Sequence, residues 1–161
     1  MRLGRAAELY QNVQDQRGEA SALTNLGTTL RKLGQLDDAS RVLQQAAALY
    51  GDMGDRRGQA GAFTNMASVL AKRAKASQAI ELLNQAVSLY DQIGDTRGQA
   101  GALTNLGMIL AQNENANEAV VRLSESAALY HQLGDLERER RARRLIEKVS
   151  NQSTNKSELS P

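Results

Sequence analysis

The sequence repeats with a period of 40 residues, and this period constrains the fold more than any other feature. The segment from Gly54 to Ala67 returns as the segment from Gly94 to Gly107. The tyrosines follow the same spacing, at Tyr10, Tyr50, Tyr90 and Tyr130. A fixed period of this length is typical of stacked supersecondary units, each of which covers the hydrophobic face of its neighbour. The chain is therefore expected to fold as a solenoid.

Each period contains two helical patterns. Within residues 57–72, four residues recur at the spacing of one apolar helix face, namely Phe63, Met66, Ala67 and Leu70. A similar face predicts a second helix over residues 76–92, with a short turn between the two. Glycine followed by aspartate separates successive periods, at Gly54–Asp55, Gly94–Asp95 and Gly134–Asp135. We expect each glycine to end a helix in the left-handed conformation and each aspartate to cap the next helix.

Composition excludes several classes of protein. With 41% hydrophobic and only 3% aromatic residues, the core must be built from Leu, Ala, Val and Ile. The chain has no cysteine and one histidine, His131, so we expect no disulfide, no metal and no cofactor. No pairing of a nucleophile with a base is readable, which argues against an enzyme. No apolar run approaches the roughly 18 residues of a membrane span and the N-terminus does not resemble a secretory signal, so we expect a cytoplasmic protein that does not enter membranes.

The helical positions resemble those of tetratricopeptide repeats. In that family the first helix carries a large apolar residue, then Leu-Gly, then another apolar residue, and the second helix carries small residues around a bulky one. The matching residues of the first helix are Leu23, Leu26, Gly27 and Leu30; Phe63, Met66, Ala67 and Leu70; and Leu103, Leu106, Gly107 and Leu110. Those of the second helix are Ala39, Leu43 and Ala46; Ala79, Leu83 and Ala86; and Ala119, Leu123 and Ser126. The usual repeat has about 34 residues, whereas the longer form here is similar to the repeats of Leu-Gly-Asn-repeat polarity adaptors and kinesin light chains.

The resemblance implies an all-α, right-handed superhelical solenoid of antiparallel helix pairs over residues 1–150. We divide this single domain into a half repeat (1–16), three full repeats (17–56, 57–96 and 97–134) and a C-terminal capping helix (135–150). The capping helix carries Arg143 and Ser150 where the preceding repeat has Leu103 and Leu110. Residues 151–161 lack an apolar pattern and are interpreted as a disordered tail. The half repeat either belongs to a longer array or is covered by another copy of the chain.

The other face of the first helix carries small and polar residues in every period. The resemblance implies that this helix lines the inside of the superhelix, so the polar face becomes a groove. The candidate peptide-binding residues are Arg17, Asn25, Thr28 and Lys32 in the first repeat; Arg57, Gly61, Thr64, Asn65, Ser68 and Lys72 in the second; and Arg97, Gly101, Thr104, Asn105 and Met108 in the third.

Asparagine recurs in this groove at Asn25, Asn65 and Asn105. A side-chain amide offers two donors and an acceptor, so it can hold both polar groups of a peptide unit. We expect these residues to fix the backbone of an extended ligand without recognising its side chains. The alternative is that they form hydrogen bonds between neighbouring helices.

Basic residues also recur in the groove. Arginine can grip a carboxylate through two N–H groups, so Arg17, Arg57 and Arg97 favour an acidic peptide, supported by Lys32 and Lys72. The alternative is that the arginines pair with the aspartates of the junctions. We expect the tyrosine series, Gly58 and Gly98 to serve packing, and Gly61 and Gly101 to leave room for a ligand.

The favoured function is a non-catalytic adaptor or scaffold that binds an extended, acidic peptide segment of another protein. A second interpretation is self-association into a homo-oligomer through residues 2–14. A third is nucleic-acid binding by the arginines at Arg138, Arg140, Arg141, Arg143 and Arg144. Glutamates interrupt that run and no aromatic side chain stands beside it to stack on bases, which disfavours nucleic acid as a partner.

Overall fold

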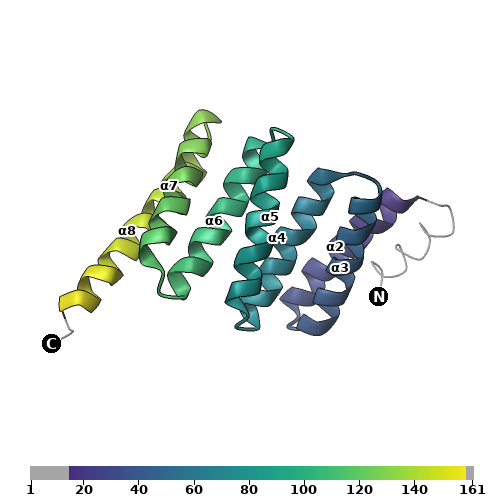
Figure 1. Ribbon diagram of the computed structural model, residues 1–161, viewed down its shortest axis with the longest axis horizontal. Coiled ribbons are helices and arrows are strands. Elements are labelled where there is room, and N and C mark those ends of the chain that lie inside the picture. The colour runs from purple at the N-terminus through teal and green to yellow at the C-terminus, as the bar shows by residue number, and fades with distance from the viewer. Residues whose placement is uncertain (1–14, 159–161) are drawn as a thin grey trace.

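The computed structural model describes residues 15–158, which form seven α-helices and no strand (Figure 1). The helices are α2 (Gln16–Lys32), α3 (Leu36–Asp52), α4 (Arg56–Lys72), α5 (Ala76–Gln92), α6 (Thr96–Gln112), α7 (Ala116–Gln132) and α8 (Leu136–Glu158). Helices α4 and α5 begin and end within one residue of the pair predicted over 57–72 and 76–92. The six described helices α2 to α7 have 17 residues each, so the period is kept in length as well as in sequence.

The glycine–aspartate pairs end one helix and begin the next, as predicted. Gly54, Gly94 and Gly134 have φ values of +68°, +65° and +68°, in the left-handed region. Each following aspartate donates its backbone N–H to the carbonyl of the tyrosine that precedes the junction, for example from Asp55 to Tyr50 at 2.8 Å. Its side chain then accepts a hydrogen bond from a free N–H in the first turn of the next helix. These acceptor contacts are Asp55 to Gly58 at 2.9 Å, Asp95 to Gly98 at 3.0 Å and Asp135 to Arg138 at 3.2 Å.

The turns inside the repeats also use the left-handed conformation. Gly34 has a φ of +79°, and the equivalent Ala74 and Glu114 have φ values of +57° and +64°. This conformation costs a residue with a β-carbon roughly 1–2 kcal/mol. The repeat architecture therefore imposes the turn geometry even where the sequence supplies no glycine.

The core lies between paired helices, where small residues let the two backbones approach. Leu43, Leu83 and Leu123 occupy the centres of α3, α5 and α7 and are fully buried. Leu43 fills the space that a side chain at Gly27 would need, since a β-carbon there would lie 2.5 Å from its Cγ. Gly107 has the same relation to Leu123, at 2.6 Å. The small residues that define the family resemblance are thus packing requirements.

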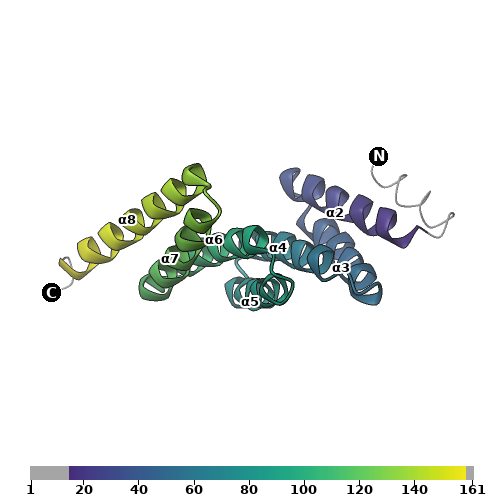
Figure 2. The ribbon, with the colours of Figure 1, turned by 90° about the horizontal axis from the view of Figure 1, so that it is seen from above.

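The helices form two layers that curve together (Figure 2). Within the layer of α2, α4, α6 and α8, each helix contacts the next. In the described part of the chain, α3, α5 and α7 contact helices of the first layer but not one another. Figure 2 shows α2 and α8 rising at the two ends of the arc, with α5 on its outer side. The first helix of each period therefore lines the concave side, as the resemblance implied.

Helix α8 extends beyond the capping helix that we predicted over residues 135–150. It ends at Glu158, so the interpretation of residues 151–161 as a disordered tail is wrong for 151–158. Buried Ala142 and Val149 anchor α8 on the rest of the array, and residues 151–158 contain neither glycine nor proline to stop the helix. The predicted half repeat over residues 1–16 and the predicted interface over 2–14 fall almost entirely on residues 1–14, which lie outside the described residues. None of the described helices is long and apolar enough to cross a membrane.

Candidate functional site

The groove asparagines have free side-chain amides. Asn25 is exposed, whereas Asn65 and Asn105 are half-buried. Among residues 15–158, no side chain or backbone group forms a hydrogen bond with any of the three amides. No contact among these residues therefore supports the alternative role, in which the asparagines bridge neighbouring helices. The three amides keep their full capacity to bind a ligand.

The groove hydroxyls, in contrast, are already engaged as donors. Thr64 donates to the carbonyl of Ala60 at 2.9 Å, and Ser68 to that of Thr64 at 3.1 Å. Thr28 and Thr104 make the same bond one turn back along their helices, at 3.1 Å and 3.0 Å. Such back-bonding satisfies the hydroxyl hydrogen within the helix. Thr28 and Ser68 therefore offer a ligand mainly an acceptor oxygen, whereas the hydroxyl of Thr104 also contacts that of Ser126 at 2.7 Å and the hydroxyl of Thr64 also contacts Tyr90.

The arginine series forms a ladder of ion pairs that connects successive repeats. Each arginine contacts the aspartate of the junction that follows its repeat: Arg17–Asp55 at 2.7 Å, Arg57–Asp95 at 2.9 Å and Arg97–Asp135 at 3.1 Å. The arginine side chains are 58–74% exposed, whereas the aspartates are only 14–17% exposed. The structure thus shows the alternative, in which the arginines pair with the junction aspartates. These aspartates compensate much of the positive charge that was expected to select the ligand.

The ladder also affects the protonation of its carboxylates. The pKa of Asp55 lies below its usual range, chiefly because the Gly58 N–H donates to it and also because of Arg17. The pKa of Asp135 is lowered in the same way, by the Arg138 backbone N–H and then by the Arg138 and Arg97 side chains. Both aspartates are therefore ionised near neutral pH and hold their arginines in place.

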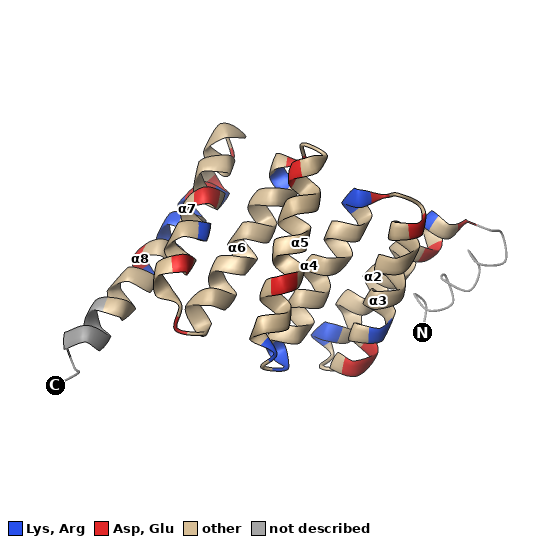
Figure 3. Ribbon diagram, in the orientation of Figure 1, with Lys and Arg blue, Asp and Glu red and all other residues tan. Residues whose placement is uncertain are grey.

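The cationic groups without a carboxylate partner lie elsewhere. Lys32 and Lys72 are exposed at the ends of α2 and α4, and neither forms an ion pair with a described residue. Figure 3 shows charged residues gathered at helix ends and along α7 and α8, whereas most of α6 is uncharged. The middle of the groove is therefore neutral and polar, and positive charge stands at its edges.

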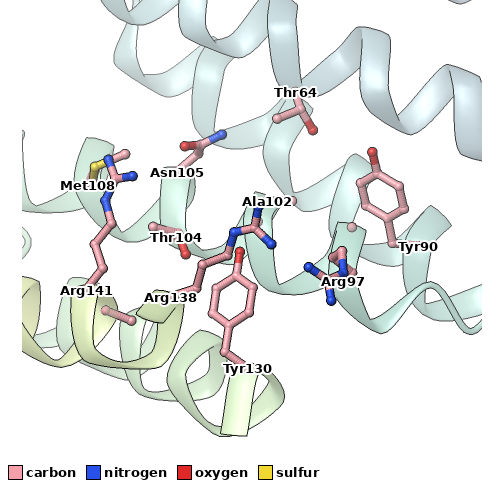
Figure 4. Close-up of a pocket in the computed structure, with 13 residues that line it drawn as sticks. Thr64, Tyr90, Arg97, Ala102, Thr104, Asn105, Met108, Tyr130, Arg138 and Arg141 are labelled. Carbon is pink, nitrogen blue, oxygen red and sulfur yellow. The ribbon is translucent and has the colours of Figure 1, made fainter. Parts of the chain in front are cut away.

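A cavity of about 340 Å³ opens on the concave side between α6 and α8; we call it the α6–α8 cavity (Figure 4). Six predicted site residues line it, namely Thr64, Arg97, Gly101, Thr104, Asn105 and Met108. The remaining lining residues are Tyr90, Gly98, Ala102, Tyr130, Arg138, Arg141 and Ala142. In Figure 4 the arginines of α8 reach toward α6, and the Tyr130 hydroxyl points into the space between the two helices.

A second cavity of about 300 Å³, the α4–α6 cavity, adjoins the first. Predicted residues Ser68, Lys72, Asn105 and Met108 line it, together with Ala71, Ile109 and Gln112. Asn105 and Met108 belong to both cavities, so they mark the place where the two meet. The predicted residues Arg57, Gly61 and Asn65 of α4 and Arg17, Asn25, Thr28 and Lys32 of α2 line neither cavity.

Sequence reasoning missed the second role of the tyrosines. Their rings do pack as predicted, since Tyr50 and Tyr90 occupy the space beside Gly58 and Gly98. Beyond that contact, the Tyr90 hydroxyl reaches α4, 3.6 Å from where a β-carbon of Gly61 would lie. The Tyr130 hydroxyl reaches Gly101 of α6 in the same way, at 3.7 Å. The period of 40 residues was the available signal, because it gives Tyr90 and Tyr130 the same spacing of 29 residues from Gly61 and Gly101.

The arginine run of α8 does not form one basic surface. Arg138 and Arg141 face the α6–α8 cavity, whereas Arg143 bonds Glu139 on its own helix at 2.8 Å. His131, which we expected near a helix end, lies in the last turn of α7 and contacts Glu139 at 3.0 Å. Among the described residues, no group of His, Cys, Asp and Glu could hold a metal ion.

Comparison with solved structures places the fold among tetratricopeptide-like repeat proteins. BtubC (BKLC) from P. vanneervenii superposes with a TM-score of 0.67 at 16% identity, over 99% of this chain and 72% of that one. A Podosopora anserina putative kinesin light chain with nearly identical TPR-like repeats gives 0.59 at 14% identity, over 94% of each chain. MamA gives 0.54 at 17% identity, over 94% of this chain and 96% of its own. These likenesses show the all-α repeat fold.

The family is shown by the sequence itself. The family described as "Soluble NSF attachment protein, SNAP" matches residues 2–128 and, again, residues 31–159. The chain belongs to this family of helical repeat proteins. A search of curated proteins finds no match.

Proposed function

We propose that the chain is a non-catalytic adaptor that binds an extended, acidic polypeptide segment in its concave groove. The observation that carries this proposal is the series of free amides at Asn25, Asn65 and Asn105, one on each of α2, α4 and α6. Exposed polar groups that recur at equivalent positions without an internal partner are suited to an external one. The fold and the SNAP description of an attachment protein support a role in holding another protein.

The amides can hold a ligand by its backbone. Neighbouring packed helices lie about 10 Å apart, and an extended chain advances about 3.3 Å per residue. Successive inner helices would thus meet the ligand at intervals of roughly three residues. Each amide would accept from a ligand N–H and donate to a ligand C=O, which selects an extended backbone in any sequence.

The acidic preference rests on a different set of cations from the one expected. Arg57 and Arg97 already pair with Asp95 and Asp135. Lys32 and Lys72 at one edge of the groove remain without an ion pair among the described residues, as does Arg141 at the C-terminal end. These side chains would attract acidic residues of the ligand without being part of the backbone contacts.

A selection of random peptides displayed on phage tests this proposal without knowledge of the partner. The wild-type protein should enrich acidic peptides that lack helix-forming patterns. The triple variant Asn25→Ala, Asn65→Ala and Asn105→Ala should bind the enriched peptides at least about tenfold more weakly, since each lost hydrogen bond contributes about 1 kcal/mol. Circular dichroism should show that the variant remains folded.

The matched control changes asparagines of the outer layer. Asn84 and Asn117 are exposed on α5 and α7, so the double variant Asn84→Ala and Asn117→Ala should bind as the wild type does. If the inner and outer variants bind the selected peptides equally well, the concave groove is not the site and the proposal is wrong.

A further inference from the structure

The positive charge in the α6–α8 cavity exceeds the negative charge of the carboxylates that contact it. No acidic residue lines the cavity, whereas three arginines do, namely Arg97, Arg138 and Arg141. The one carboxylate that contacts them is Asp135, whose Oδ2 lies 3.1 Å from Arg97 and 2.8 Å from Arg138. Arg141 forms no ion pair with a described residue. Three guanidinium groups against one carboxylate leave a local excess of two positive charges.

The cavity also holds the arginines in place. Arg138 is fixed by Asp135 and by the ring of Tyr130, whose centre lies 5.9 Å from its guanidinium carbon. Arg97 is held on the same carboxylate from α6. Guanidinium groups that are oriented before a ligand arrives lose little freedom when they bind it. Arg141 remains as the arginine whose donors are all available.

Neutral donors complete the lining. The Asn105 amide has no partner among the described residues, and it stands between this cavity and the α4–α6 cavity. Burial and the nearby Asp95 raise the pKa of Tyr90, so its phenol keeps its hydrogen near neutral pH, and its hydroxyl forms a hydrogen bond with Thr64 at the edge of the cavity. Figure 4 shows the cavity bordered by these groups together with Tyr130, Arg138 and Arg141.

We propose that the α6–α8 cavity binds the phosphoryl group of a phosphorylated serine or threonine side chain. This inference rests on the proposed function, because the phosphorylated residue belongs to the segment held in the groove. A phosphoryl group carries about −1.5 to −2 charges and three acceptor oxygens near neutral pH, which matches the excess of two positive charges and the set of N–H and O–H donors. A carboxylate would compensate half of that charge.

The test uses three degenerate peptide pools that differ only in a fixed central residue: phosphoserine, glutamate or serine. The full chain should bind the phosphoserine pool at least about tenfold more tightly than the glutamate pool, because charge-assisted hydrogen bonds contribute about 1.5–3 kcal/mol each. In Arg141→Gln this ratio should fall to within about threefold, because the variant loses much more affinity for the phosphoserine pool than for the glutamate and serine pools. Equal binding of the phosphoserine and glutamate pools by the wild type would overturn the inference.

The control variant is Arg144→Gln, which removes an exposed arginine of the same helix that does not line the cavity. It should keep the full phosphoserine preference. An equal loss in both variants would show that overall charge, not the cavity, selects the ligand, and would also overturn the inference. Inorganic phosphate, titrated alone, should compete with the phosphoserine pool only weakly, since it lacks the backbone contacts.

The two proposals fail separately in this experiment. The double variant Asn25→Ala and Asn65→Ala leaves the lining of the cavity intact. It should weaken binding of all three pools and preserve the ratio between them. If the serine pool binds this variant as tightly as it binds the wild type, the groove proposal fails. If the wild type binds the phosphoserine and glutamate pools equally, only the proposal of the phosphoryl site fails.

Discussion

Two glycines three residues apart in α4 have opposite surroundings. A β-carbon at Gly58 would collide with the ring of Tyr50, whereas one at Gly61 would meet only the Tyr90 hydroxyl at 3.6 Å. Alanine is favoured over glycine in a helix by about 1 kcal/mol, and forcing a group into a packed space costs about 1–3 kcal/mol. Gly61→Ala should therefore raise the free energy of unfolding and Gly58→Ala should lower it, as measured by urea denaturation. A stabilised Gly58→Ala variant would contradict the packing role.

At this scale the sequence predicted positions better than roles. The asparagine series was identified because it recurs on one helix face, and the same recurrence placed the arginines in the groove. Pairing of the arginines with the junction aspartates was one of two alternatives, and the sequence could not decide between them, because Asp55 and Arg17 lie 38 positions apart and meet only when two repeats stack. The tyrosines likewise have two contacts, one through the ring and one through the hydroxyl. Their spacing in the sequence reveals only that they recur.

At the scale of the element, the junction aspartates join helix capping to ion pairing. Because the pKa of Asp55 is lowered in the folded state, its contribution to stability is present above the ordinary aspartate pKa of about 4 and is lost as the pH falls through the folded value. The free energy of unfolding should therefore decrease between about pH 5 and pH 2. In Asp55→Asn, which can still cap α4, this decrease should be shallower.

Denaturation in urea at a series of pH values measures this effect. Asp52→Asn is the matched control, since Asp52 is exposed and forms no ion pair with a described residue. It should keep the pH dependence of the wild type. Parallel curves for the wild type and Asp55→Asn would show that the ladder does not contribute to stability.

Helix boundaries were predictable wherever a local signal sets them. The glycine–aspartate pairs fixed the junctions, because a left-handed residue and a cap act within one turn of chain. The end of α8 was not predictable in this way, because polar residues 151–153 are exposed and only the absence of a breaking residue lets the helix continue. A helix anchored by Ala142 and Val149 can extend past its last apolar contact.

For the whole molecule, stability is expected to vary along the array. Each helix contacts only its neighbours in the stack, and in such arrays stability is roughly a sum of local and interface terms. Gly58→Ala, which disturbs the contact between α3 and α4, should therefore lower hydrogen-exchange protection most in α2, α3 and α4. Helices α7 and α8 should lose less. Equal loss in all helices would show that the array unfolds as one unit.

The solenoid itself followed from the period, but the α6–α8 cavity did not. Its lining comes from five helices, α4 to α8, and depends on how α8 crosses the open side of α6. Helix α8 carries Arg138 and Arg141 at the positions equivalent to Gly98 and Gly101 of α6, so its side of the cavity is unlike that of any earlier described repeat. Features that recur could be predicted from the sequence, whereas those formed at the end of the array required the structure.

The ladder of Arg17–Asp55, Arg57–Asp95 and Arg97–Asp135 also bears on how such a chain can change in length. Each arginine stands near the beginning of its unit and contacts the aspartate of the junction that follows, 38 residues later. If residues 57–96 were duplicated in tandem, every seam would again bring one arginine to one aspartate. Genetic duplication or loss of a whole unit would therefore leave no charge without its counterpart, whereas an insertion of any other length would separate them.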